Sequence, residues 1–178
     1  FLVLGGDLRS IKLAEMLAED ENKVYSYGQE KSEEIVENNY IEKCRNLNLA
    51  IEKSEFIVAP VPFTSDGVNI NCSFSEEKIP IEELLKNNKT KTFFAGSINN
   101  ENLKKLKEKY LDVIDIMKRE ELAVLNTIAT AEGTIEVAIK NTGKILQGAN
   151  VLVLGFGRVA KIVAAKFNNL SAKVTVAA

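Results

Sequence analysis

The residues best placed to do chemistry follow an apolar run, where Val151–Leu154 leads into the pattern Gly-x-Gly-x-x-Ala. Four apolar residues in a row suit a strand that is buried on both faces of a parallel sheet. Gly155 permits a tight turn, Gly157 lets the backbone approach a pyrophosphate, and Ala160 is small enough for a following helix to pack against the strand. This pattern predicts the phosphate-binding turn of a dinucleotide-binding βαβ unit.

The helix expected over about 157–169 supports this prediction, because its free N–H groups and the positive end of its dipole favour a phosphate. A tight turn between a strand and a helix, with no ligand, is the alternative. If the turn binds a dinucleotide, its cofactor-binding residues are Gly155, Phe156, Gly157, Arg158, Val159 and Ala160.

Lys173–Ala178 is expected to form the second strand of this unit. The side chain that recognises the adenosine ribose usually lies about 20–25 residues after the first glycine, which corresponds to about residue 179 or 180. An acidic residue there would favour NAD, whereas an arginine would favour the 2′-phosphate of NADP. Because the strands of a single βαβ unit lack neighbours, we expect the sequence to be a fragment of a longer protein.

Other polar residues follow the strands expected in the first part of the chain. Arg9 could bind a carboxylate or a phosphate, or it could be an arginine on a helix surface. Thr64 and Ser65 could donate hydrogen bonds to a substrate, although serine and threonine are also common in turns.

The densest polar cluster in an otherwise apolar stretch consists of Asn126, Thr130 and Glu132. Glu132 could act as a general base if burial raised its pKa. Alternatively, Thr130 caps a helix and Glu132 is a first-turn acid that the helix dipole favours. The sequence leaves both interpretations open.

The composition excludes several classes of function. Hydrophobic residues make up 46% and charged residues 27%, as in ordinary soluble globular proteins, and a net charge of −2 gives no electrostatic footprint for nucleic acid. No apolar run approaches the roughly 20 residues of a membrane span, and the sequence opens directly on a strand with no secretion signal. We therefore expect no nucleic-acid partner, no membrane segment and a cytoplasmic location.

The chain contains no histidine, which excludes Ser-His-Asp and Cys-His nucleophiles and histidine-ligated zinc from this portion of the protein. Cys44 and Cys72 stand alone, without a Cys-x-x-Cys pair, so they indicate neither a zinc site nor a disulfide framework. We expect no metal site, and any proton transfer must use carboxylates, lysine, tyrosine or water.

Strands and helices alternate over about 1–118, and this repeat predicts a doubly wound parallel sheet of the flavodoxin or Rossmann type. The expected strands are Phe1–Leu4, Val24–Tyr27, Phe56–Ala59, Thr92–Ala95 and Val113–Ile116, with short strand-like pieces within 63–80. The expected helices cover about 8–19, 47–54 and 99–110. Asp7 suits the N-cap of the first helix, and Pro80 suits the first residue of a further helix that ends near Asn87-Asn88. Residues 29–46 are polar and give no clear assignment.

A helix over about 128–141 is expected to connect this sheet to the glycine-rich unit. The α/β chain then has three parts: an N-terminal substrate domain over 1–125, a linking helix and turn over 126–147, and the start of a Rossmann NAD(P)-binding domain over 148–178. Ligands of such folds collect beyond the carboxyl ends of strands and in the cleft between domains. The loops that qualify are 5–9, 60–65, 95–97 and 126–134.

Several motifs together carry a family resemblance along essentially the whole chain. They are Leu4–Arg9, Ala59–Val61, Phe94–Gly96, Asn126-x-x-x-Thr130-x-Glu132-Gly133-Thr134, Gly148 and Val153–Arg158. In these motifs the chain resembles the A subunit of dipicolinate synthase, a family of spore-forming bacteria. The family usually has proline at the position of Ala129 and often glycine at the position of Ala160, and the absent proline leaves the start of the helix less sharply defined.

The resemblance implies an oxidoreductase that oxidises dihydrodipicolinate to dipicolinate during sporulation. It implies NADP as the cofactor, with NAD as the other candidate, and the flavoprotein-like B subunit of dipicolinate synthase as the partner in a heteromer. It also implies the mother-cell cytoplasm as the location, and it is compatible with a homo-oligomer.

This chemistry is reasonable on physical grounds. Loss of a hydride and a proton from a dihydropyridine dicarboxylate gives an aromatic ring, so the protein mainly has to bind two carboxylates and orient the ring. On this interpretation Arg9 and Glu132 are the catalytic candidates, with Glu132 taking the proton. The substrate-binding candidates are Arg9, Thr64, Ser65, Asn126 and Thr130.

Two other classes of function also fit the sequence. One is another two-domain NAD(P)-dependent dehydrogenase, of the 2-hydroxy-acid, alanine or adenosylhomocysteine type, although such enzymes commonly use a catalytic histidine that this portion lacks. The other is a non-catalytic nucleotide-binding polypeptide that regulates or scaffolds the flavoprotein-like partner. A chain with only half of a cofactor site could also bind nothing.

Overall fold

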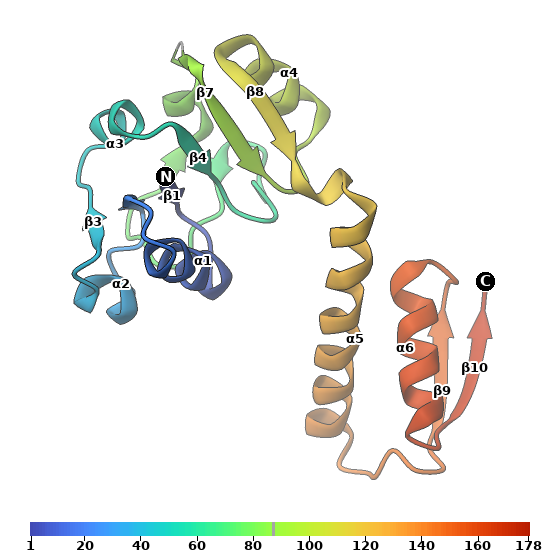
Figure 1. Cartoon of the computed structure of the whole chain (residues 1–178). Coiled ribbons are helices and arrows are strands. Elements are labelled where there is room, and N and C mark those ends of the chain that lie inside the picture. The colour runs from blue at the N-terminus through green and yellow to red at the C-terminus, as the bar shows by residue number, and fades with distance from the viewer. Residues whose placement is uncertain (87) are drawn as a thin grey trace. The chain divides into compact units, whose positions relative to one another are not determined.

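The computed structural model describes residues 1–86 and 88–178 of the chain. It consists of two compact units, Phe1–Lys118 and Arg119–Ala178 (Figure 1). The division comes earlier than the predicted boundary at residue 125, because the helix that follows begins at Glu120.

The first unit is built on a six-stranded sheet in which every pair of neighbouring strands is parallel. Its order is β3-β2-β1-β4-β7-β8 (Figure 1). The strands are β1 (Leu2–Leu4), β2 (Val24–Tyr27), β3 (Ile41–Lys43), β4 (Phe56–Val58), β7 (Asn88–Ala95) and β8 (Tyr110–Asp115). Counted along the chain, this is the order 3-2-1-4-5-6 of a Rossmann-type sheet. The predicted parallel α/β fold is confirmed.

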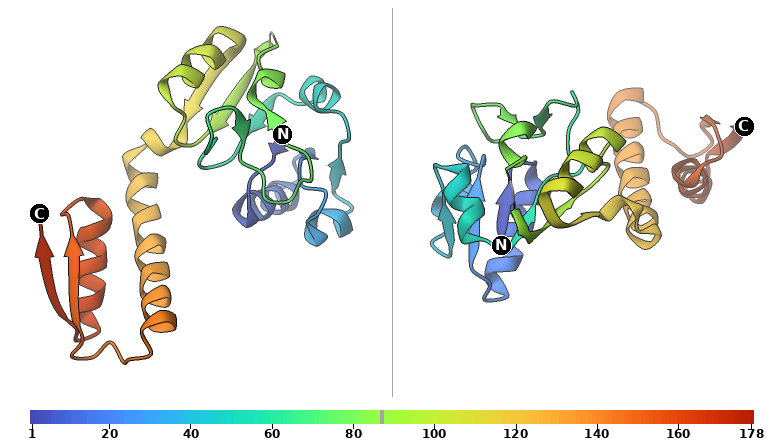
Figure 2. Two further views of the ribbon diagram at one scale, coloured as in Figure 1. Left: turned by 180° about the vertical axis from the view of Figure 1, so that it is seen from behind. Right: turned by 90° about the horizontal axis from the view of Figure 1, so that it is seen from above.

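Helices flank both faces of this sheet (Figure 2). They are α1 (Leu8–Glu19), α2 (Glu33–Glu37), α3 (Leu47–Lys53), α4 (Asn100–Lys109) and the short 3-10 helices η1 (Ile81–Leu84) and η2 (Ile116–Lys118). Val3 packs with α1 and α2, whereas Leu2 and Leu4 pack with α3, η1 and α4. This division follows from the alternation of side chains along a strand, and it makes the sheet doubly wound.

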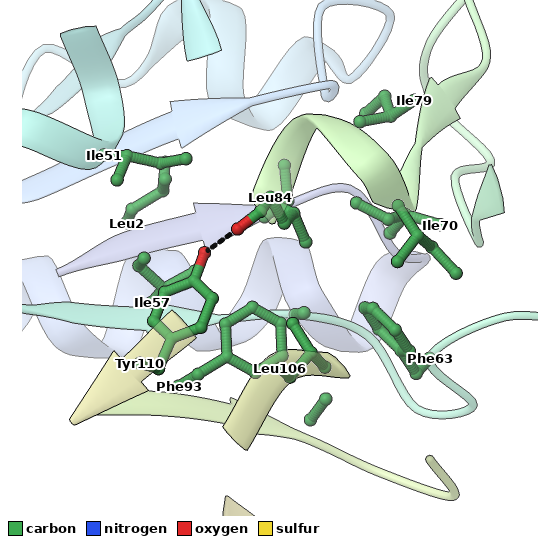
Figure 3. Packing of buried hydrophobic residues seen from close by; sticks show 14 of the residues in the cluster. Leu2, Ile51, Ile57, Phe63, Ile70, Ile79, Leu84, Phe93, Leu106 and Tyr110 are labelled. Atoms are coloured by element: carbon green, nitrogen blue, oxygen red, sulfur yellow. Dashed lines mark hydrogen bonds between the residues drawn. The ribbon is translucent and has the colours of Figure 1, made fainter. Parts of the chain in front are cut away.

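The larger core lies on the face that α3, η1 and α4 cover (Figure 3). Phe93 of β7 is completely buried there, with its ring centroid 5.7 Å from that of Phe63 and 5.0 Å from that of Tyr110. The Tyr110 hydroxyl donates a hydrogen bond of 3.0 Å to the carbonyl oxygen of Leu84, which anchors η1 to β8. Burial of this hydroxyl therefore leaves no polar group without a partner.

The helices of this unit begin at side-chain caps, as local sequence predicts. The Asp7 carboxylate accepts the backbone N–H of Arg9 at 3.0 Å, which confirms the predicted cap of α1. Ser32, Asn46 and Asn99 accept backbone N–H groups at the starts of α2, α3 and α4 in the same way.

One local prediction for this unit needs correction, and one segment without a prediction receives its elements. The segment 29–46 contains α2 and β3; the sequence gives no clear assignment there because Ile41 is the only buried residue of that short strand. The helix predicted to begin at Pro80 is only the 3-10 helix η1, and Pro80 itself belongs to a two-stranded antiparallel sheet. That sheet pairs β5 (Asn69–Ile70) with β6 (Ile79–Pro80) and agrees with the strand-like pieces predicted there. The predicted end of the helix at Asn87 lies outside the described residues.

The second unit contains the predicted βαβ arrangement. Its elements are α5 (Glu120–Thr142), β9 (Asn150–Leu154), α6 (Arg158–Asn169) and β10 (Lys173–Ala177). β9 and β10 are parallel, with Val153 beside Val176, and α6 packs Val163 and Phe167 against the face that carries Val153. The glycine-rich turn therefore lies between a parallel strand and a helix, as expected.

The connecting helix is longer than predicted. It begins at Glu120 rather than near residue 128 and ends at Gly143, which adopts a left-handed conformation. Asn126 and Thr130 consequently lie inside the helix, and the Thr130 hydroxyl donates to the Asn126 carbonyl oxygen at 2.8 Å. The prediction that residues 126–134 form a loop entering the helix is wrong, because these threonines satisfy their hydroxyls on the preceding helical turn.

By length and composition alone, α5 is apolar enough to cross a membrane, although the sequence analysis expects no such segment. Only 17% of its most apolar window is buried. The helix nevertheless carries Glu132 at its centre, where the carboxylate pairs with Lys166 of α6 at 2.8 Å. Any explanation of this apolar surface must therefore also account for Glu132, which lies on the same helix and pairs with Lys166 of α6.

Candidate functional site

The glycine-rich turn between β9 and α6 has the geometry that a phosphate group requires. Gly155 has a φ of +90°, which L side chains rarely adopt, and its N–H donates to the Ala177 carbonyl oxygen at 2.6 Å. Gly157 is the N-cap residue of α6, with an ordinary φ of −76° and no side chain to cap the helix. Within the described residues, the N–H groups of the first turn of α6 therefore meet no capping side chain.

Space is open in front of this turn. No other group of the described residues lies within 4 Å of the position that a Cβ atom would take at Gly155 or at Gly157. Neither glycine is therefore needed for packing inside this unit. The backbone conformation of Gly155 accounts for that glycine, whereas a ligand whose phosphates approach the backbone accounts for Gly157, so the residues present fit a dinucleotide.

The side chains around the turn add positive charge and an apolar surface. Arg158 is 61% exposed and pairs with Glu120 at 2.8 Å, whereas the Lys161 ammonium lies 5.0 Å from the centroid of the Phe156 ring. Phe156 itself is 55% exposed. Two cations within one turn of a helix N-terminus favour an anion, and an exposed aromatic ring offers a flat surface for a planar group.

A cavity of about 790 Å³ in this unit lies near the amino end of β9 and is lined by residues such as Lys144, Asn150 and Phe167. Ligands of parallel α/β sheets bind at the carboxyl ends of the strands. The glycine-rich turn, and not this cavity, is therefore the candidate cofactor site.

In the first unit, the loops that follow β1, β4 and β7 meet at the carboxyl edge of the sheet. The Arg9 guanidinium donates to the Val61 carbonyl oxygen at 2.5 Å, and the N–H of Phe63 donates to the Gly96 carbonyl oxygen at 2.8 Å. A Cβ atom at Gly96 would lie 2.6 Å from a Val61 methyl and 2.9 Å from Met117. The sequence-predicted loops 5–9, 60–65 and 95–97 are thus brought together.

Arg9 is the principal charged group at this edge. Its Nε and Nη2 atoms donate to the Asp7 carboxylate at 3.0 and 2.7 Å, and these hydrogen bonds hold the Asp7 pKa below its ordinary value. Its side chain is still 61% exposed. Among the described residues Nη1 donates no hydrogen bond, so this end of the guanidinium is available to an anion.

Thr64 and Ser65 both lie in the loop after β4, as expected, but only the Ser65 hydroxyl is exposed there. The Thr64 hydroxyl donates to the Asp66 carboxylate at 3.2 Å and accepts the N–H of Gly67 at 2.9 Å. The same carboxylate accepts three further hydrogen bonds from Val68 and Asn69, and these bonds hold the Asp66 pKa well below its usual range. Thr64 therefore stabilises a turn, while Ser65 is exposed.

The loop after β1, where a nucleotide would bind in a sheet of this topology, makes hydrogen bonds to other parts of the chain. At the switch point of such a sheet, between β1 and β4, phosphates approach the loop after β1. Here the Gly6 N–H donates to Asn71 and its carbonyl oxygen accepts the N–H of Ser73, both at 2.8 Å. The Asp7 carboxylate also caps α1 and adds a negative charge. The first unit therefore has the topology of a nucleotide-binding fold, but the N–H of Gly6 is already bonded to Asn71 rather than free for a phosphate.

Asp115, at the end of β8, is a residue that the sequence analysis missed. Its buried carboxylate accepts backbone N–H groups from Ser97 at 3.0 Å, Ile98 at 3.1 Å and Met117 at 3.1 Å. Ser97 has a φ of +56°. Asp115 thus fixes the loop after β7 in an unusual conformation. The feature of the sequence that could have pointed to this role is an acidic residue at the end of an apolar strand.

Replacement of Asp115 by alanine is expected to lower the free energy of unfolding of the first unit by about 1–3 kcal/mol, because the buried N–H of Ile98 and the N–H groups of Ser97 and Met117 lose their acceptor. Urea denaturation followed by tyrosine fluorescence measures this change, since Tyr25, Tyr27, Tyr40 and Tyr110 all belong to the first unit. Asp112→Ala, on the exposed face of the same strand, serves as the control. Equal losses in the two variants would contradict the assigned role.

The cluster of Asn126, Thr130 and Glu132 is exposed on α5. The Glu132 carboxylate is 64% exposed and pairs with Lys166. The burial that a general base at this position would need is therefore missing from the described residues. The contacts of Glu132 instead join α5 to α6.

Among the described residues, no group of three or more Cys, Asp or Glu side chains could hold a metal ion. Cys44 and Cys72 are both free thiols. Burial raises the pKa of each thiol, and the Cys72 Sγ atom donates to the Gly28 carbonyl oxygen at 2.7 Å. These cysteines are suited to packing rather than to nucleophilic chemistry.

Residues 1–117 match the sequence model of the family described as the N-terminal domain of the A subunit of dipicolinate synthase. The A subunit of dipicolinate synthase from Bacillus subtilis (strain 168) is 27% identical over 178 residues, which cover 99% of this chain and 59% of the relative. The crystal structure of the same subunit from Bacillus halodurans has 31% identity and a TM-score of 0.79 over 99% of this chain and 60% of that one. The crystal structure of the Bacillus subtilis protein has 27% identity and a TM-score of 0.75 over 98% of this chain and 59% of that one. The chain spans about three-fifths of the length of these relatives.

Proposed function

Because the chain belongs to the family of the N-terminal domain of the dipicolinate synthase A subunit, we propose that it forms part of an oxidoreductase that makes dipicolinate from dihydrodipicolinate. The observation that carries this proposal is the open glycine-rich turn at the start of α6, where a dinucleotide fits. The family relatives, which share the fold over nearly the whole chain, support it.

The cofactor in this proposal is NADP, or NAD, bound to the second unit. Gly155 and Gly157 let its phosphates approach the backbone, and the first turn of α6 donates N–H groups to them. Arg158 and Lys161 supply positive charge, and Ala160 lets α6 pack close to β9. The turn spans Gly155, Phe156, Gly157, Arg158, Val159 and Ala160. Bound there, the cofactor would supply the acceptor for the hydride.

The substrate in this proposal is a small ring dicarboxylate held at the carboxyl edge of the first sheet. Arg9 binds one carboxylate through its Nη1 end, and its pair with Asp7 fixes the direction of the guanidinium. The loop that Asp115 holds, with Ser97 exposed on it, forms the other side of this edge. Thr64 stabilises the loop after β4, and Ser65 of the same loop offers its hydroxyl to the substrate.

Proton release does not need a buried base in this proposal. Loss of a hydride and a proton makes the ring aromatic, so water suffices as the acceptor of the proton. We therefore assign Glu132 to the contact between α5 and α6, and Asn126 and Thr130 to the surface of α5, rather than to the chemistry. The B subunit of dipicolinate synthase is the proposed partner, and the cytoplasm of the mother cell is the proposed location.

Turnover is tested with a protein that carries this chain and has the full length of the relatives, here called the family-length protein. Growth of dipicolinate absorbance from dihydrodipicolinate is followed with NADP or NAD, and with the B subunit added or omitted. Formation of dipicolinate that depends on the nucleotide supports the proposal. Nucleotide binding without turnover, even with the B subunit present, would show a non-catalytic role instead.

Arg9→Ala is expected to weaken binding of dipicolinate by about tenfold or more, because the variant loses a charged hydrogen-bond donor to a carboxylate. Binding of the nucleotide should not change, because Arg9 belongs to the first unit and the glycine-rich turn to the second. Calorimetric titration of the family-length protein with each ligand separates the two effects. Lys12→Ala, on the same helix, is the control. Unchanged dipicolinate affinity in Arg9→Ala would remove Arg9 from the substrate site.

A further inference from the structure

Ser97, in the loop after β7, has a φ of +56°, a backbone conformation that L side chains rarely adopt. Among the described residues, Glu21 and Ser171 are the other non-glycine residues in this conformation, each with a φ of +61°. Both follow the end of a helix, and their N–H groups donate to carbonyl oxygens of its last turn. A left-handed residue is a common way for a helix to end. Ser97 ends no helix, so its conformation needs another explanation.

The conformation of Ser97 is held by a side chain of the neighbouring strand. Asp115 of β8 pairs with Ala95, the last residue of β7. From this position its buried carboxylate accepts the N–H groups of Ser97 at 3.0 Å and Ile98 at 3.1 Å. Strained residues persist only where the surrounding structure over-determines them, and they are concentrated at active sites and ligand-binding segments. The contacts of Asp115 therefore direct attention to what Ser97 offers a ligand.

The hydroxyl is the group that Ser97 offers. The residue is exposed, and among the described residues this hydroxyl makes no hydrogen bond. Glycine adopts the same backbone conformation without strain, so the fold does not need a side chain at this position. What serine adds is a hydrogen-bond donor at the carboxyl edge of the sheet, where ligands of parallel α/β folds bind. Ser171, by contrast, precedes β10 and lies at the amino edge of the second sheet.

Val61 links the loop of Ser97 to Arg9. The Arg9 guanidinium donates to the carbonyl oxygen of Val61 at 2.5 Å. A Cβ atom at Gly96, the residue before Ser97, would lie 2.6 Å from a methyl group of the same valine. Arg9 and Ser97 therefore belong to one site, and the half-buried Val61 adds apolar surface to it.

This site holds one cationic donor and one neutral donor, an arrangement that fits a ligand with two acidic groups. We propose that the Ser97 hydroxyl donates to the second carboxylate of the substrate while Arg9 binds the first, and that Asp115 positions Ser97. This inference rests on the proposed function, which places a ring dicarboxylate at this edge. A monocarboxylate would place its only charge on Arg9, the stronger donor. Ser97 is then the residue that distinguishes dicarboxylates from monocarboxylates.

The test compares two ligands, dipicolinate with two carboxylates and pyridine-2-carboxylate with one. Calorimetric titration measures the affinity of the family-length protein for each. Ser97→Gly should weaken dipicolinate binding by at least about tenfold, because a hydrogen bond to a charged group is lost, and should leave pyridine-2-carboxylate binding unchanged. Glycine tolerates the conformation at this position, so misfolding does not explain the loss. Unchanged dipicolinate affinity, or equal losses for the two ligands, would overturn the inference.

Ser171→Gly is the matched control, because it makes the same substitution at nearly the same φ in the second unit. It should leave dipicolinate affinity unchanged. A loss equal to that of Ser97→Gly would mean that the lost hydroxyl is not the cause, and the inference would fail.

Ser65 is the competing hydroxyl, because it is exposed in the loop after β4. Ser65→Ala is expected to affect dipicolinate binding less than Ser97→Gly does. A tenfold loss in Ser65→Ala with none in Ser97→Gly would assign the second carboxylate to Ser65 instead.

Asp115→Asn tests the positioning of Ser97. An amide has one acceptor oxygen where the carboxylate has two, so it cannot hold the loop in the same way. Dipicolinate affinity should fall and pyridine-2-carboxylate affinity should not. Combined with Ser97→Gly, Asp115→Asn should cause no further loss, because its effect passes through the Ser97 hydroxyl. Losses that add would contradict this role of Asp115.

The parent protein separates failure of this inference from failure of the proposed function. A family-length parent that binds neither ligand would contradict the proposed substrate and this inference with it. A parent that binds dipicolinate as tightly as Ser97→Gly does would overturn the inference alone.

Discussion

Phe93→Ala is expected to lower the free energy of unfolding of the first unit by about 3–5 kcal/mol. Phe93 is completely buried in the second half of β7, and its ring packs against those of Phe63 and Tyr110 (Figure 3). Its removal leaves a cavity bounded by these two rings and deprives the sheet of contact with the loop after β4. Such a loss is a large share of the stability of a small domain.

The tyrosine fluorescence of the chain measures this loss in urea denaturation, because every tyrosine belongs to the first unit. Phe94→Ala is the matched control: it removes the same side chain from the next residue, which is only partly buried and whose ring centroid lies 6.3 Å from that of Phe56. A smaller loss is expected there. Similar losses in the two variants would mean that the packing around Phe93 does not dominate the stability of the unit.

The strands of the first unit could be predicted because their apolar residues are consecutive in the sequence. Phe56–Ala59 and Thr92–Ala95 predict strands that are buried on both faces, and the structure places them side by side as β4 and β7. β3 gave no such signal, since Glu42 and Lys43 are exposed and only Ile41 reaches the core. A strand of three residues with one buried side chain resembles a loop in sequence.

For α5 the sequence predicts a loop where the structure has a helix. Asn126, Thr130 and Thr134 suggest a loop, because polar residues of this kind compete with helical hydrogen bonds. In the structure the two threonine hydroxyls donate to the carbonyl oxygens four residues earlier, so they are compatible with the helix interior. Sequence reasoning about polar residues cannot distinguish these outcomes without the packing of the apolar face.

The two candidate sites also differ in how far the sequence predicts them. The glycine-rich turn is local, so Gly155 and Gly157 could be predicted from their spacing and from the strand and helix beside them. The edge of the first sheet depends on contacts between distant segments, such as Arg9 with Val61 and Gly6 with Asn71. No local pattern in the sequence contains these contacts, and the same holds for the contact between Asp115 and Ser97.

Gly157→Val is expected to weaken the binding of NADPH by at least about tenfold, which corresponds to about 1.4 kcal/mol, while the second unit keeps its fold. With a φ of −76° and open space around its Cα atom, Gly157 can be replaced without strain or clash inside the unit. The new side chain projects into the space through which a pyrophosphate would approach the first turn of α6. Quenching or enhancement of NADPH fluorescence in the family-length protein measures the affinity.

The neighbouring glycine makes this prediction specific. Gly155→Ala should destabilise the second unit, by about 1–2 kcal/mol, because its φ of +90° is strained for any L side chain. Thermal unfolding followed by circular dichroism should therefore separate a glycine that the fold needs, Gly155, from one that only the ligand needs, Gly157. If Gly157→Val bound NADPH as tightly as the parent protein, the turn would be a structural connection between β9 and α6, and the cofactor would have to bind elsewhere.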